Sequence, residues 1–336
     1  TSERLGIVYT PNEIVDFILQ SVDDVLKSEF GASIADEGVH ILDPFTGTGT
    51  FIVRLLQSGL IGAEDLLRKF RYELHANELV LLAYYVAAIN IEETFHELAG
   101  GEYEPFNGIV LTDTFQMNEA DDELDSRGVF PENNSRVEKQ KSQQIQVIVG
   151  NPPYSSGQKS ENENNPNKRY ATLDGRISET YVANSSSTTR TSVYDSYIRS
   201  IRWASDRIGE KGVVAFVTNG GFLDSVTADG LRISLGHEYS TLYVLNLRGN
   251  SRLPGEKGKR EGGNVFPVRV PIAIWIAIRN PESAEKGVLN YFEVSDYLSG
   301  ASKLEFLRNA VSVRSVDWRP LAPTKSGDWI SVRSPE

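Results

Sequence analysis

Seven short apolar runs recur along the chain and are separated by stretches of different pattern. The runs are rich in β-branched residues and mostly continuous, as in strands that are covered on both faces of a parallel sheet. The predicted strands are residues 38–45, 72–79, 108–115, 146–153, 212–219, 240–247 and 271–278. With helices between them, they predict an α/β fold built on a doubly wound, mostly parallel, seven-stranded Rossmann-like sheet.

Two of the intervening stretches have helical periodicity. Residues 11–31 start with Pro11, which suits the first turn of a helix, and stop at Gly31. Residues 193–209 carry an apolar stripe at helical spacing, and we expect its members to pack in the core: Tyr194, Tyr197, Ile198 and Ile201.

One long segment departs from this alternation. Residues 155–193 are rich in Ser, Thr and Asn and have almost no aliphatic periodicity. So long an irregular stretch inside a compact domain is usually functional or disordered. We interpret it as a polar insert that forms a lid over a site, with plain disorder as the alternative.

Four polar residues lie at or near the carboxyl ends of predicted strands: Asp43, Glu78, Asp113 and Asn151. Ligands of doubly wound sheets bind beyond these ends, where the strand order reverses. A single acid at such a position is commonly a helix-start or loop carboxylate, so the ordered series is the stronger signal. It predicts a ligand site at one edge of the sheet.

Composition excludes several kinds of site. The chain of 336 residues has no cysteine, so it has no disulfide, thiol nucleophile or Cys-based zinc site, and its four histidines are dispersed. We therefore predict no metal site. No apolar run is long enough to span a membrane and the first residues do not resemble a signal peptide, so we expect a soluble, cytoplasmic protein. The chain lacks an initial Met, and we expect it to be part of a longer polypeptide.

The net charge of −12 has the wrong sign for binding nucleic acid by bulk electrostatics. The charge is uneven, however, because residues 248–269 carry six basic and two acidic side chains. We expect the basic loop 248–261 to contact phosphates, with an exposed turn as the alternative. Its candidate cations are Arg252, Lys257, Lys259 and Arg260. The acidic run 118–125 is expected to be a solvated loop.

The stretch DPFTGTGTF (43–51) leaves a strand and enters a helix, and Gly47 and Gly49 let the backbone come close to a ligand. It is no phosphate loop, because the motif's lysine is absent, and the third glycine of a dinucleotide fingerprint would fall at Ile52. The acids at three strand ends suit a ligand with cationic groups, ribose hydroxyls and an adenine amine. S-adenosylmethionine fits this description.

Six motifs in order resemble the adenine-specific amino-methyltransferases of DNA, in the class with the gamma-type motif order: GIVYTP, DPFTGTGTF, NEL, DTF, NPPY and GNVF. The resemblance spans roughly residues 5–280. Stretches such as YDSYIRSIRWASDRIG and TADGLR are most similar to the methyltransferase region of type ISP single-chain restriction-modification enzymes of bacteria. Those enzymes join a nuclease, a helicase-like translocase, a methyltransferase and a target-recognition domain.

The resemblance implies methyl transfer from S-adenosylmethionine to the exocyclic amine of a flipped-out adenine in duplex DNA, on the fold of class I methyltransferases. Residues 1–280 would form the methyltransferase domain, and residues 281–336 a linker or the start of a target-recognition domain. Carried over by motif, the cofactor residues are Tyr9, Thr10 and Pro11 at one side of the methionine portion, Asp43, Thr46, Gly47 and Gly49 at the other, Glu78 at the ribose, and Asp113 and Phe115 at the adenine. Glu73 remains a second candidate for the ribose.

The run Asn151-Pro152-Pro153-Tyr154 provides the chemistry. An adenine amine is a poor nucleophile because its lone pair is delocalised into the ring. The Asn151 side-chain carbonyl and the Pro152 main-chain carbonyl are suited to accept both amine hydrogens, which favours a tetrahedral nitrogen, and the prolines hold these dipoles rigid. Tyr154 would stack on the flipped base, and Phe266 would approach its other face unless it is a core residue.

Two other interpretations remain open. Asn-Pro-Pro-Tyr also occurs in protein-glutamine and RNA methyltransferases, although the N-terminal VYTP and the long insert disfavour these. A non-catalytic DNA-recognition module could keep the same fold, although the intact Asn151–Tyr154 motif and glycine loop argue against it.

Overall fold

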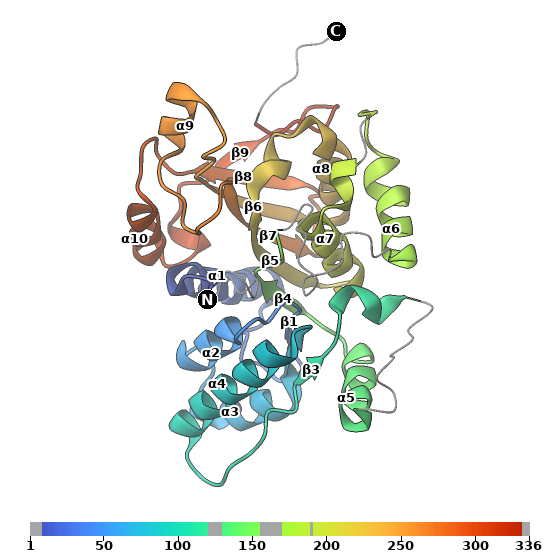
Figure 1. Ribbon diagram of the computed structural model, residues 1–336, viewed down its shortest axis with the longest axis vertical. Coiled ribbons are helices and arrows are strands. Elements are labelled where there is room, and N and C mark those ends of the chain that lie inside the picture. Colours follow the sequence, from blue (N-terminus) through green and yellow to red (C-terminus); the bar gives the residue numbers. More distant parts are fainter. Residues whose placement is uncertain (1–8, 120–129, 155–169, 189–190, 331–336) are drawn as a thin grey trace.

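The computed structural model describes residues 9–119, 130–154, 170–188 and 191–330 (Figure 1). Most of the predicted acidic loop, from residue 120 on, lies outside these residues, as do positions 155–169 and 189–190 of the predicted insert.

The described residues form one mixed sheet in the order β3-β2-β1-β4-β5-β7-β6-β8-β9. Its strands are β1 (Ile41–Asp43), β2 (Leu74–Glu78), β3 (Ile109–Leu111), β4 (Val147–Gly150), β5 (Gly212–Asn219), β6 (Thr241–Arg248), β7 (Ile272–Arg279), β8 (Val288–Glu293) and β9 (Arg319–Leu321). The seven predicted strands are therefore confirmed. The predicted seven-stranded sheet is wrong in detail, because β8 and β9 extend it and because β7 and β9 run antiparallel to their neighbours.

Helices cover both faces of the sheet. One face packs against α1 (Asn12–Phe30), α2 (Thr50–Gln57), α3 (Ala63–Arg68), α4 (Leu81–Ala99) and α10 (Gly300–Ala310). The other face packs against α5 (Pro131–Lys141), α6 (Ala171–Ile177), α7 (Ser196–Arg207) and α8 (Asp229–Glu238). Among the described residues, no helix combines the length and apolar character needed to cross a membrane.

This double cover explains why the strand sequences are continuously apolar. In β5, Val213, Ala215 and Val217 point to the α1 face, whereas Val214 and Phe216 point to the α7 face. Every second residue of a strand faces the same side, so a strand covered on both sides needs apolar residues at every position.

The predicted domain boundary after residue 280 falls between two strands of one sheet. Strand β8 pairs in parallel with β6, and β9 pairs with β8. Helix α10 contacts α1, and the Arg308 guanidinium donates to the Glu13 carboxylate. Residues 288–321 are thus continuous with the fold that carries the strand-end residues.

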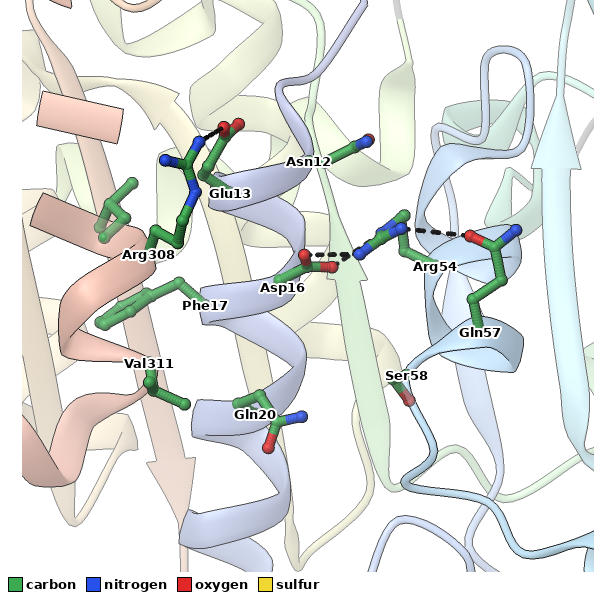
Figure 2. A pocket seen from close by; sticks show the side chains of 11 residues that line it. Asn12, Glu13, Asp16, Phe17, Gln20, Arg54, Gln57, Ser58, Arg308 and Val311 are labelled. Atoms are coloured by element: carbon green, nitrogen blue, oxygen red, sulfur yellow. Dashed lines mark hydrogen bonds and ion pairs between the residues drawn. The ribbon is translucent and has the colours of Figure 1, made fainter. Parts of the chain in front are cut away.

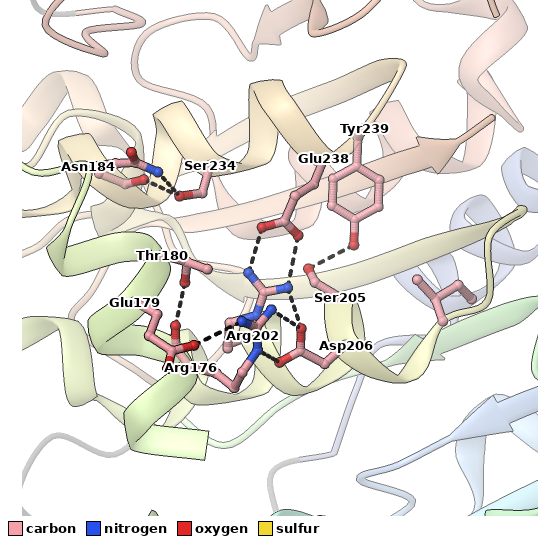
Figure 3. A network of polar contacts seen from close by, with 12 residues as sticks. Arg176, Glu179, Thr180, Asn184, Arg202, Ser205, Asp206, Ser234, Glu238 and Tyr239 are labelled. Carbon is pink, nitrogen blue, oxygen red and sulfur yellow. Dashed lines mark hydrogen bonds and ion pairs between the residues drawn. The ribbon is translucent and has the colours of Figure 1, made fainter. Parts of the chain in front are cut away.

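The described part of the predicted insert is helical and well packed. Helix α6 continues into a π-helical turn, Ser178–Val182, and its apolar side chains are buried: Tyr170, Leu173, Ile177 and Tyr181. Figure 3 shows how this segment is tied to α7 and α8. Arg176 donates to Asp206, and the buried Arg202 donates to both Asp206 and Glu238.

Candidate active site

The parallel pairing of β3, β2, β1 and β4 brings the predicted polar residues into one row. Glu78 ends β2 and Asp43 ends β1, whereas Asp113 and Asn151 follow the ends of β3 and β4. The spatial order is therefore Asp113, Glu78, Asp43, Asn151. Neighbouring strands are about 4.8 Å apart, so the row spans about 14 Å.

Asp43 is fully buried in this row. Its Oδ1 accepts the Phe45 main-chain N–H at 3.1 Å, and its Oδ2 has no hydrogen-bond partner among the described residues. Burial raises the pKa of Asp43 to about 8, and the nearby Glu78 carboxylate adds to the rise. A β-carbon at Gly150 would lie 3.0 Å from Oδ1, so any larger residue there would press on this carboxyl group.

The glycine loop after β1 is held by Glu78. Oε2 of this carboxylate accepts the Gly47 N–H at 2.8 Å and Oε1 accepts the Val80 N–H at 2.7 Å. Burial raises the pKa of Glu78, although these main-chain donors oppose the rise. Gly47 has a φ of +57°, and a β-carbon there would meet no atom within 4 Å, so the loop borders open space at this point.

Two further loop residues have structural tasks. The Thr46 hydroxyl donates to the Asp43 carbonyl at 2.9 Å, and the Thr46 N–H donates to the Asn77 carbonyl at 3.0 Å. Gly49 has a φ of +91°, and a β-carbon there would lie 3.3 Å from Ala87 O and Ile91 of α4. Gly49 therefore permits close packing of the loop on α4.

Glu73 lies at the opposite end of β2 from Glu78. It is 4% exposed, accepts the Gly38 N–H and the Lys69 ammonium, and pairs with Arg68. Its carboxylate is thus engaged at the amino edge of the sheet, away from the row of strand-end residues.

Asp113 caps the short 3-10 helix Thr114–Asn118. Its Oδ1 accepts the Phe115 N–H at 3.1 Å, and its Oδ2 accepts the Tyr170 hydroxyl at 3.0 Å. The Phe115 ring is buried and meets Tyr170 and Phe45 edge to face. Sequence reasoning missed Tyr170, although the regular spacing of apolar residues from 170 to 181 was a signal for a packed helix.

Asn151 and Pro152 follow β4 at the end of the row. The Asn151 Nδ2 donates to Thr10 Oγ1 at 3.0 Å, and its Oδ1 is buried without a hydrogen-bond partner among the described residues. A buried acceptor of this kind normally finds a partner. Thr10, like Pro152, is buried, whereas Tyr9 is 61% exposed and Pro11 directly precedes α1.

The rings of Tyr154 and Phe266 contact each other directly. Their centroids are 5.9 Å apart and their planes are inclined by 80°. Phe266 is 4% exposed and belongs to the core cluster on the α1 face, whereas Tyr154 is half-buried and burial raises the pKa of its hydroxyl well above the ordinary value. The two rings therefore pack edge to face on each other, and the burial of Phe266 favours its interpretation as a core residue.

The predicted basic loop contains a short helix, α9 (Gly255–Glu261), with no buried residue. The four candidate cations in this region are all exposed: Arg252, Lys257, Lys259 and Arg260. Lys259 lies 3.7 Å from Glu256, and Arg260 lies 3.7 Å from Asp296.

Lys303 of α10 holds the end of this helix. Its ammonium donates to the carbonyls of Glu261 and Gly263, each at 2.7 Å, and the side chain is fully buried. Burial lowers the pKa of Lys303 to about 8. β-carbons at Gly262 and Gly263 would collide with the backbone of residues 298–300, so two glycines are needed for this contact.

Among the grooves that the described residues form away from the row of strand-end residues, two border Arg54. One, of about 420 Å³, runs along α1 between α2 and α10, where Asp16 accepts the Arg54 guanidinium (Figure 2). It contains no predicted site residue. The other, of about 400 Å³, also borders Arg54 and reaches Tyr9 and Thr48, so it touches the glycine loop.

Comparison with known proteins gives one family match. The model of the Eco57I restriction-modification methylases matches residues 64–250. No match was found among curated proteins.

Solved structures match the chain over almost its whole length. The nuclease-deletion mutant of the type ISP restriction-modification enzyme LlaGI, bound to a DNA substrate mimic, is 50% identical over 98% of this chain, with a TM-score of 0.92. The DNA-bound, ATP-dependent type ISP enzyme LlaBIII is 46% identical over 99%, with a TM-score of 0.93, and DrdV in complex with DNA is 40% identical over 98%, with a TM-score of 0.88. The chain covers only 27%, 23% and 32% of these three chains, respectively.

Proposed function

Because the chain belongs to the Eco57I restriction-modification methylase family, we propose that it transfers the methyl group of S-adenosylmethionine to the exocyclic amine of a flipped-out adenine in duplex DNA. The observation that carries this proposal is the buried, unpartnered Oδ1 of Asn151 beside the row of strand-end carboxyl groups. An acceptor without a partner, next to a site for a cationic cofactor, suits a substrate that brings two N–H donors.

The order of the row fits the chemical order of the cofactor. From Asp113 through Glu78 to Asp43, the acceptors suit an adenine amine, ribose hydroxyls and the cationic methionine portion, in that sequence. The open space beside Gly47 leaves the loop backbone accessible to such a ligand. When bound, S-adenosylmethionine supplies an electrophilic methyl group.

The protein's part in the reaction is to prepare the amine. Asn151 Oδ1 and the Pro152 carbonyl accept its two hydrogens, so that its lone pair is directed at the methyl carbon. Methyl transfer to this nitrogen would form the N–C bond as the S–C bond of bound S-adenosylmethionine breaks, and the nitrogen would then release one proton to solvent. The acceptors are fixed before the reaction, because Pro152 is buried and the Asn151 amide is hydrogen-bonded to Thr10.

The target base reaches this site only outside the duplex. We assign the stacking surface to Tyr154 alone, since Phe266 is buried against it. The exposed cations of Arg252, Lys257 and the end of α9 are suited to the DNA backbone. Because its net charge is −12, the chain should bind DNA weakly and with steep salt dependence. It should show no sequence preference, because we assign the base contacts to a target-recognition domain.

We further propose that the chain acts as the methyltransferase region of a longer restriction-modification polypeptide with nuclease and translocase regions. The chain matches less than a third of the length of each type ISP enzyme, and this supports the assignment. The methyltransferase region then includes β8 and β9, because they continue its sheet.

The test is methyl transfer by the chain from labelled S-adenosylmethionine to unmethylated plasmid DNA at low salt, with the nucleosides identified by mass spectrometry. We expect N6-methyladenine. Asn151→Ala should lower the rate about 100- to 1000-fold, as for loss of one preorganised acceptor, and leave the calorimetric affinity for the cofactor unchanged. The exposed Asn309→Ala is the matched control. Methylated cytosine, or transfer to glutamine peptides or RNA but not to DNA, would contradict the proposal.

A further inference from the structure

We propose that Thr10 is a positioning residue, which orients the amide of Asn151 for catalysis instead of serving as a cofactor contact. The proposal rests on the proposed function, because it assigns Asn151 the task of accepting the target amine. The resemblance described above implies a different role for Thr10, at the methionine portion of the cofactor.

The contact itself is direct. Asn151 Nδ2 donates to Thr10 Oγ1 at 3.0 Å, although the two residues are 141 positions apart in the chain. A side-chain amide has a donor end and an acceptor end. Because the donor end is bound to Thr10, the acceptor end, Oδ1, remains without a partner among the described residues and is available to the substrate.

The position of Thr10 is fixed by the fold. Thr10 is 5% exposed, and the following Pro11 carbonyl accepts the N–H groups of Ile14 and Val15, which starts α1. Helix α1 contacts both β4 and β5, and its Ile14 and Val15 side chains are fully buried. The hydroxyl therefore reaches Asn151 from a helix start that is packed on the strand preceding Asn151.

This arrangement matters because the Asn151 amide must accept a hydrogen bond from the target amine. If the amide turned by half a rotation, its NH₂ group would face the amine, and two donors would then face each other. Without the Thr10 hydroxyl, Nδ2 of Asn151 would be left without the one partner that the structure gives it. An unsatisfied buried donor favours a different side-chain orientation. A displacement of about 1 Å of a catalytic group lowers rates by up to about 100-fold.

Two substitutions separate the hydroxyl from the shape of the side chain. Thr10→Val keeps the size and removes the acceptor, and Thr10→Ser keeps the acceptor. We expect Thr10→Val to lower kcat about 10- to 100-fold at saturating plasmid DNA, with the Kd for S-adenosylmethionine unchanged in calorimetry. Thr10→Ser should restore kcat to within about threefold of the unaltered chain, since it keeps the hydrogen-bond acceptor. Retained cofactor binding also shows that the variants are folded.

A double-mutant cycle tests whether Thr10 acts through Asn151. If it does, Thr10→Val has no further effect on kcat in an Asn151→Ala background, whereas a general structural role gives additive losses. As a readout independent of turnover, the side-chain amide resonance of Asn151, identified in Asn-selective ¹⁵N spectra by its loss in Asn151→Ala, should shift in Thr10→Val and much less in Thr10→Ser.

Three results overturn the assignment: a Kd raised tenfold or more with unchanged kcat, which makes Thr10 a cofactor contact; additive losses in the cycle; or equal losses in Thr10→Val and Thr10→Ser. Failure of the proposed function is distinguishable from these, because the unaltered chain would then yield methylated cytosine or would methylate peptides or RNA but not DNA, or Asn151→Ala would methylate DNA at the rate of the unaltered chain.

Discussion

Asp43→Asn should stabilise the ligand-free protein and at the same time weaken cofactor binding. Asp43 is fully buried, its Oδ2 has no hydrogen-bond partner among the described residues, and burial raises its pKa to about 8. In the folded protein the carboxyl group therefore stays protonated at neutral pH. An asparagine has the same shape as the protonated acid and keeps the oxygen that accepts from Phe45.

The magnitude follows from proton linkage. An aspartate in the unfolded chain has a pKa of about 3.9, so the unfolded state releases its proton at low pH whereas the folded state keeps it up to pH 8. The contribution of this group to the free energy of unfolding is thus fully present below about pH 4 and is lost as the pH rises from about 4 to about 8. The loss is about 4 kcal/mol at pH 7 and roughly 1 to 2 kcal/mol at pH 5, and Asp43→Asn removes it.

The cofactor reverses this preference. A cationic ligand beside Asp43 favours the ionised form, so binding should release a proton. We expect the Kd of the unaltered chain to fall from pH 6 to pH 8, whereas Asp43→Asn should bind about 10- to 100-fold more weakly at pH 8, with little pH dependence.

Urea unfolding at pH 5 and pH 7 measures the predicted gain in stability, and the exposed Asp317→Asn is the control. Calorimetry in two buffers with different ionisation enthalpies measures the proton released on binding. A variant that is less stable than the parent chain at pH 7, or a stability gain that does not shrink at pH 5, would refute the reasoning about burial. Unchanged affinity would remove Asp43 from the cofactor site.

Three further outcomes are expected. Tyr154→Ala should weaken capture of a flipped 2-aminopurine by about 1–3 kcal/mol. Phe266→Ala should chiefly lower the free energy of unfolding, by about 3–5 kcal/mol, as for loss of a core ring. Equal fluorescence losses in two equally stable variants would mean instead that both rings stack on the base. Lys257→Ala should reduce the slope of log K for DNA binding against log salt concentration by about 1. Lys303→Met should reduce this slope further although Lys303 is buried, because its ammonium no longer binds the carbonyls that hold the end of helix α9. Burial lowers the pKa of His75 to about 3, so on acidification the unfolded chain takes up a proton before the folded chain does. The free energy of unfolding should therefore decrease as the pH falls through 6.5, by about 2 kcal/mol between pH 8 and pH 5. Urea unfolding of His75→Gln should not show this decrease.

The strands that the sequence predicts are those buried on both faces, because their apolar runs are unbroken. Strand β8 was missed because its buried and partly exposed residues alternate, and β9 because it has only three residues, including Pro320. Strand direction was not predictable either. A run such as β7 has the same composition whether it runs with its neighbours or against them, and in the structure it pairs antiparallel with both β5 and β6.

The polar insert illustrates how composition can conceal periodicity. Most of its residues are polar, yet Tyr170, Leu173, Ile177 and Tyr181 recur at helical intervals and are all buried. Four apolar residues per three turns are enough to dock a helix. Averaging over residues 155–193 masked this signal, and the contact between Tyr170 and Asp113 was missed with it.

The acids at the sheet edge were predictable as strand-end residues, but their contacts reveal a second task. Glu78 accepts the N–H groups of Gly47 and Val80, so the residue assigned to the ribose also holds the loop beside which the cofactor would lie. Loss of binding in Glu78→Ala therefore does not distinguish a lost ribose contact from a displaced loop. Varying the ligand does: removing the 2′-hydroxyl of S-adenosylhomocysteine should lower its affinity for the parent chain and should cost nothing more in Glu78→Ala if the two groups are in contact. Additive losses would mean that Glu78 acts only through the glycine loop.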